Sequence, residues 1–142
     1  MDIAALIAWV VTAGGGFILL AKWVTSGGHK PTTEPRSRLS PGQVFGHFLL
    51  AAAGLVLWIV YVASDSDGVT WAAFAILVVV ALIGFSMFFR WLPQVRGRER
   101  VGGAAGGNNA TPETKLPVPV VVAHGLAGAT TLVLVLIAAA KA

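Results

Sequence analysis

Two apolar stretches, GHFLLAAAGLVLWIV at residues 46–60 and AHGLAGATTLVLVLI at residues 123–137, decide the fold class of this 142-residue chain. Neither stretch contains Asp, Glu, Lys or Arg, and each lies within a longer uncharged run. About 20 consecutive apolar residues are enough for a helix to cross the hydrocarbon core of a bilayer. Because a helix pairs its own backbone N–H and C=O groups, it is the structure that such runs adopt in lipid. Both stretches therefore predict transmembrane helices.

The charge distribution along the rest of the chain repeats this pattern. Charged residues make up only 11% of the sequence and hydrophobic residues 56%, whereas ordinary soluble domains carry about 25% charged residues. We therefore predict an all-α integral membrane four-helix bundle that forms a single transmembrane domain over residues 1–142. Its helices are expected at about residues 3–23, 41–63, 69–91 and 118–140.

Local signals place several of the helix ends. The segment SPGQ starts the second helix, because Ser40 can cap it, Pro41 suits its first turn and Gln43 can complete a capping box. Pro93 is expected to stop the third helix just before it. The run GGG at residues 14–16 predicts either a close-packing surface or a local break in the first helix, and close packing is favoured.

The basic residues predict the orientation in the membrane. Segment 22–42 holds four Lys or Arg against one acidic residue, segment 90–115 holds five against two, and the turn at 64–68 holds two Asp and no base. Basic loops stay on the cytoplasmic side of a membrane. We therefore expect a multi-pass protein of the cell membrane with loops 24–40 and 93–117 in the cytoplasm. Both termini are then extracytoplasmic.

Several functional classes are poorly supported by the composition. The chain has no cysteine, which excludes disulfides and thiolate metal sites. No hydrolase, nucleotide-binding or metalloprotease motif is present, so the sequence does not decide whether the protein is an enzyme. The basic residues lie beside helix ends, where they contact the lipid bilayer, and nucleic acid is not expected as a partner.

An internal repeat is predicted from two independent alignments. Shifting the chain so that His47 falls on His124 gives six identities in fourteen positions. A shorter shift superposes GFILLAKW, which starts at Gly16, on GFSMFFRW, which starts at Gly84. The two shifts differ by nine positions, which is the length of GGAAGGNNA at 102–110, a segment typical of a flexible insertion. The sequence therefore predicts two copies of a helix–loop–helix unit, a 2+2 bundle, related by an axis along the membrane normal.

His47 and His124 are the candidate site residues. By helix rise, they lie roughly 9 Å and 8 Å beyond the starts of their helices, and therefore at similar depth. Histidine is a general metal ligand, and a polar group within a bilayer is costly and usually functional. As axial ligands they could hold haem b, or another metal, and small residues such as Ala51, Gly54 and Gly128 are expected to leave room for a flat ring. The same residues equally suit hydrogen bonds between helices or a proton relay.

Three functions stay open at this stage. The sequence favours a small accessory or scaffold subunit of a membrane complex, in which the histidines are structural and the partners are other subunits or further copies of the chain. The alternative is a b-type bis-histidine haem or quinone-linked electron-transfer protein that uses His47 and His124. A small-molecule permease would need a polar path, and no acidic residue lies within the uncharged runs.

Three segments carry a resemblance to known sequences. LPVPVVVAHGLAGATTLVLVLIAAA, GHFLLAAAGLVLWIVYVA and FFRWLP together resemble small four-span membrane proteins encoded by GC-rich actinobacteria, which are generally uncharacterised. The likeness covers the second to fourth helices and rests on the block VPVVVAHG. It implies a membrane location and a four-helix fold, and it supplies no activity. The paired histidines also loosely resemble those of small b-type membrane cytochromes.

Overall fold

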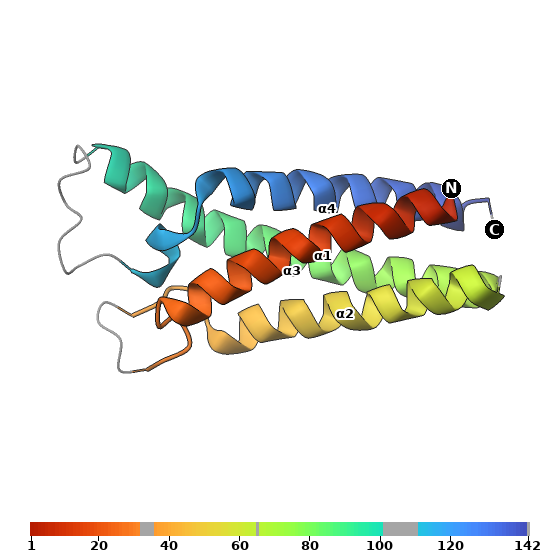
Figure 1. Cartoon of the computed structure of the whole chain (residues 1–142), viewed down its shortest axis with the longest axis horizontal. Coiled ribbons are helices and arrows are strands. Elements are labelled where there is room, and N and C mark those ends of the chain that lie inside the picture. Colours follow the sequence, from red (N-terminus) through yellow and green to blue (C-terminus); the bar gives the residue numbers. More distant parts are fainter. Residues whose placement is uncertain (32–35, 65, 101–110, 142) are drawn as a thin grey trace.

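A computed structural model confirms the all-α fold class, with four long helices packed in one bundle (Figure 1). It describes residues 1–31, 36–64, 66–100 and 111–141, except for the side chains of 98–100. Within these residues there is no β-strand. The elements are α1 (Asp2–Thr25), α2 (Pro41–Ser64), α3 (Asp67–Arg100), the short 3₁₀ helix η1 (Pro112–Lys115) and α4 (Val118–Ala139).

All four long helices have the length and composition of membrane spans. Large apolar side chains, among them Leu49, Leu82 and Leu126, are exposed on their outward faces. An exposed apolar surface of this extent is typical of contact with lipid, and the chain is a multi-pass membrane protein. Both termini and the α2–α3 turn lie at one end of the bundle, termed the terminal end (Figure 1). The opposite end, where α1 ends and α2 and α4 begin, is termed the loop end.

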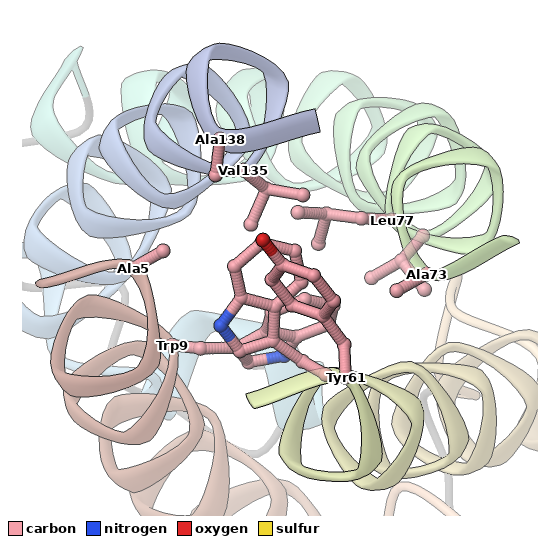
Figure 2. Close-up of a cluster of buried hydrophobic side chains, with 9 residues drawn as sticks. Ala5, Trp9, Tyr61, Ala73, Leu77, Val135 and Ala138 are labelled. Carbon is pink, nitrogen blue, oxygen red and sulfur yellow. The ribbon is translucent and has the colours of Figure 1, made fainter. Parts of the chain in front are cut away.

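The helices form two closely packed pairs. α1 packs most extensively on α4, and α2 packs most extensively on α3. The α3/α4 and α1/α2 contacts are less extensive. α2 and α4 consequently lie diagonally across the bundle from each other, as the view along the helices shows (Figure 2).

The core at the terminal end is built from aromatic residues of α1 and α2 and from smaller residues of α3 and α4. Trp9 and Tyr61 point into the centre (Figure 2), where they pack together with Trp58. The Trp9 and Trp58 rings lie 6.4 Å apart, and those of Trp58 and Tyr61 lie 4.9 Å apart. The smaller neighbours from α3 and α4 include Ala73, Leu77, Val135 and Ala138.

The start of α2 follows the predicted signal only in part. The backbone N–H of Gln43 donates to Ser40 Oγ at 3.2 Å, as a capping serine requires. The Gln43 side chain does not reach back to complete the capping box. Its Nε2 instead donates to Ser86 Oγ of α3 at 2.6 Å, and its Oε1 accepts a bond from Arg90 at 3.4 Å. The polar side chain thus links α2 to α3.

The expected end of the third helix near residue 91 is corrected by the structure. α3 continues through Pro93 to Arg100. A proline removes one backbone donor from a helix but does not always end it. At the next residue of α3, Gln94 Nε2 donates to the Arg90 carbonyl at 2.9 Å. The predicted loop 93–117 is therefore helical at its start and contains η1 near its end, while the GGAAGGNNA segment lies outside the described residues.

Glu113 of η1 is fully buried and connects the two segments that precede α2 and α4. Its Oε1 accepts the backbone N–H of Leu39 at 2.9 Å and also bonds to the Ser37 hydroxyl. Ser37 Oγ accepts the indole N–H of Trp23 at 3.1 Å. Trp23 and Leu39 form a small apolar cluster with Val44 at this position. η1 therefore closes the loop end of the bundle.

Candidate functional site

His47 and His124 meet in the centre of the bundle. They project from α2 and α4, which lie diagonally opposite, and their ring centroids are 6.3 Å apart. The two ring planes are nearly perpendicular, at 74°. Each histidine belongs to a different closely packed helix pair, so the histidine pair lies where the two helix pairs face each other.

Each imidazole is held by a hydrogen bond to a backbone carbonyl of the helix that packs on its own. His47 Nδ1 lies 3.1 Å from the carbonyl oxygen of Val80 in α3, and His124 Nδ1 lies 2.9 Å from that of Thr12 in α1. A carbonyl oxygen can only accept, so Nδ1 must carry the hydrogen in both rings. In the neutral imidazole, Nε2 then keeps an unshared electron pair. Both side chains are therefore fixed in the tautomer that can bind a metal or accept a proton through Nε2.

Two glycines make these carbonyls accessible. Gly16 and Gly84 each lie four residues after the bonded carbonyl, of Thr12 and Val80 respectively. Helical side chains lean toward the N-terminus, so a side chain at this position would cover the carbonyl one turn before it. A Cβ built on Gly16 would lie 3.1 Å from Cε1 of His124, and one built on Gly84 would lie 3.1 Å from the Cε1 atom of His47. The missing side chains leave the space that the imidazole edges occupy.

The GGG run therefore packs against the site and does not break α1. Gly15 faces the Cβ atom of His124 as well as its ring, whereas a Cβ on Gly14 would meet nothing within 4 Å. α1 is continuous from Asp2 to Thr25. Close packing, the favoured of the two predictions for this run, is the arrangement found.

The two histidine contacts are built from matching positions in the sequence. Thr12 and Val80, which supply the carbonyls, are separated along the chain by the same interval as Gly16 and Gly84, which open the two GF motifs. Each histidine is bound by a helix from the other half of the chain: the first-half His47 by α3, and the second-half His124 by α1. Neither half of the chain completes its histidine contact alone.

The surroundings of the pair differ on its two sides. Toward the terminal end, Thr12 Oγ1 and Thr131 Oγ1 are 3.1 Å apart, and each hydroxyl also bonds to a carbonyl of its own helix. Trp9 packs over Gly54, where a Cβ would lie 2.9 Å from its ring. The expectation that Gly54 leaves room for a ligand is therefore corrected, because Trp9 fills that space.

The described residues contain no group of three or more His, Asp or Glu side chains that could hold a metal ion together. The site thus offers two imidazole ligands and no carboxylate. Sequence reasoning found both histidines and both GF motifs but did not connect them. The available signal was the glycine that opens each motif, because it exposes the carbonyl one turn earlier.

The chain was compared with protein-family models, curated proteins and solved structures. No protein-family model matches the chain, and no curated protein or solved structure matches it.

Proposed function

We propose that the protein is a small membrane electron carrier that binds one b-type haem, with His47 and His124 as the axial ligands. The observation that carries the proposal is the pair of imidazoles from diagonally opposite helices, whose ring centroids are 6.3 Å apart. Two imidazoles bound to one metal at about 2 Å each have ring centroids about 6 Å apart. The separation in the protein matches this requirement.

The number of ligands favours haem over a bare metal ion. Structural zinc takes four protein ligands and catalytic zinc takes three, and the described residues contain no such group. Haem iron needs only two axial ligands from the protein, because the macrocycle supplies the others. A two-histidine site within a membrane is therefore better suited to haem.

The hydrogen bonds on Nδ1 are those expected for ligating histidines. A metal-bound imidazole commonly donates its other N–H to a backbone carbonyl or a carboxylate, which fixes the ring orientation and raises the basicity of the ligand. The Val80 and Thr12 carbonyls fill this role for His47 and His124. On the side toward the terminal end, Trp9 packs over Gly54 and would exclude water from the histidine pair.

The matching intervals support a duplicated helix pair as the origin of the site. Two copies related by a two-fold axis along the bundle would place one histidine on each side of that axis. A single ligand held between them would then contact both halves equally. This arrangement accounts for the occurrence of the same histidine at the same depth in α2 and α4.

When bound, such a haem would supply reversible one-electron transfer. The protein would hold the iron through the two imidazoles and exclude water with the Trp9 side chain. The Val80 and Thr12 carbonyls would fix the orientation of the two rings. Quinone is a suitable electron-exchange partner for a carrier located within the bilayer.

A three-variant series tests this proposal. His47→Ala and His124→Ala should each abolish the haem content measured by a pyridine haemochrome assay. His29→Ala is the matched control, because His29 lies in the segment between α1 and α2, and this variant should keep the wild-type content. Retention of the full haem spectrum by both of the first two variants would refute the ligand assignment.

A structural role is the second candidate, and the histidine–carbonyl bonds favour it directly. Hydrogen bonds of this kind between membrane helices contribute about 0.6–2 kcal/mol each. The protein would then be an accessory or scaffold subunit of a membrane complex. In that case the wild-type protein should stay colourless even after haem is supplied. His47→Ala and His124→Ala should lower its stability, and other subunits should co-purify with it.

A further inference from the structure

A cavity of about 330 Å³ lies beside the last turns of α3, away from the histidine pair. Its lining consists of Phe89, Leu92, Pro93, Arg96 and Gly97. These residues follow one face of the helix, at spacings of three and four. Phe89 is strongly exposed, and a Cβ built on Gly97 would meet nothing within 4 Å, so the cavity is open to the surroundings of the bundle.

The cavity changes from apolar to cationic along the helix. Phe89 and Leu92 form the apolar part of the lining, and the Phe89 side chain is exposed on the surface of the bundle. Arg96 lies seven residues beyond Phe89, which is roughly 10 Å along the helix axis. The headgroup layer on each side of a bilayer is about 5–8 Å thick. A lipid whose acyl chain lay along Phe89 and Leu92 would therefore have its phosphate within reach of Arg96.

Arg96 makes no hydrogen bond or ion pair with any other described residue, so its guanidinium can engage a ligand. Arg90, on the same helix, is already bonded to Gln43. Guanidinium groups bind phosphate in a bidentate manner, with hydrogen bonds strengthened by charge. We propose that this cavity, termed the α3 interfacial cavity, binds an anionic glycerophospholipid, with its phosphate at Arg96 and an acyl chain along Phe89 and Leu92.

The proposal is tested by native mass spectrometry of the full chain, purified with equal amounts of phosphatidylglycerol and phosphatidylcholine. The wild-type protein should retain phosphatidylglycerol preferentially. Arg96→Gln should weaken this retention about fivefold, the effect expected for one basic residue near an anionic lipid. Lys30→Gln, which removes a cation from the segment between α1 and α2, should leave it unchanged. Equal retention of both lipids by the wild type, or equal effects of the two substitutions, would overturn the proposal.

Two further measurements separate a lipid from a simple anion and from a general charge effect. Gly97→Leu should also reduce phosphatidylglycerol retention, because its side chain enters open space in the cavity and leaves the charge intact. Inorganic phosphate at millimolar concentration should not displace the lipid, since it makes no acyl contact. Displacement by phosphate alone, or full retention by Gly97→Leu with its folding intact, would contradict lipid binding in this cavity.

Discussion

At the scale of single residues, the account depends on how each histidine is held. His47 and His124 bond through Nδ1 to carbonyls that are reachable because Gly16 and Gly84 lack side chains. A histidine, a carbonyl and a glycine four residues after that carbonyl form one unit, and the chain contains this unit twice. The histidines themselves could be predicted from the sequence, because they stand out in uncharged runs. Their carbonyl partners could not, because every helical residue carries a carbonyl.

The glycines provide the sharpest residue-scale prediction. Gly16→Ala would place a Cβ 3.1 Å from the His124 ring and push the imidazole away from the Thr12 carbonyl. Compared with an alanine substitution elsewhere in α1 that shares the gain in helix propensity, weakening of this bond should cost up to about 2 kcal/mol of unfolding free energy. Gly14→Ala is the matched control on the same helix, since its Cβ meets nothing, and helix propensity alone should make it neutral or more stable by up to about 1 kcal/mol. Unfolding in mixed micelles measures both, and equal stability of the two variants would contradict this role of Gly16.

At the scale of elements, the helices were predictable and their ends less so. Uncharged runs of about 20 residues define spans in lipid without reference to packing. The end of α3 was not predictable, because a proline removes one backbone donor without always ending a helix, and α3 continues through Pro93 to Arg100. The Gln43 side chain likewise leaves the capping box for Ser86 of α3. The contact of Gln43 with another helix is one that the local pattern does not specify.

η1 is the element that sequence reasoning missed. The sequence marks Glu113 only as one acidic residue of a basic loop, yet its side chain is fully buried and accepts the Leu39 N–H. No local pattern marks a loop carboxylate for burial, because its partners lie more than seventy residues earlier.

The role of Glu113 can be measured. Glu113→Ala should lower the unfolding free energy by about 1–3 kcal/mol, because it removes the buried carboxylate that accepts from the Leu39 N–H and the Ser37 hydroxyl. Lys115→Ala, in the same element but exposed, should change stability by no more than about 0.5 kcal/mol. Chemical denaturation of the purified variants distinguishes them. If Glu113→Ala were as stable as Lys115→Ala, η1 would not hold the loop end closed.

At the scale of the whole molecule, the two halves of the chain make complementary contributions. Ala5 and Ala73 are separated by the same interval as the two GF motifs, and Trp58 and Val135 by the same interval as the two histidines. All four of these side chains are fully buried in the same core. The matching intervals were visible in the sequence. The crossed pairing, in which each half binds the other's histidine, required the helix arrangement.

The orientation in the membrane is a prediction at this scale. Basic loops on the cytoplasmic side place Asp67 outside and Lys30 inside. The chain has no native cysteine, so Asp67→Cys and Lys30→Cys can be labelled without background. A membrane-impermeant maleimide added to intact cells should react with Asp67→Cys alone, and Lys30→Cys should react only after permeabilisation. The reverse labelling pattern would invert the orientation.

The central claim is that His47 and His124 are the two axial ligands of one haem. The most direct test is the reduced-minus-oxidised absorption spectrum of the wild-type protein purified in detergent, with haem quantified per chain. The account predicts a Soret band that shifts on reduction and about one haem per chain. A protein that stays colourless after haem is supplied would contradict it and leave the histidine pair as a hydrogen-bonded helix contact.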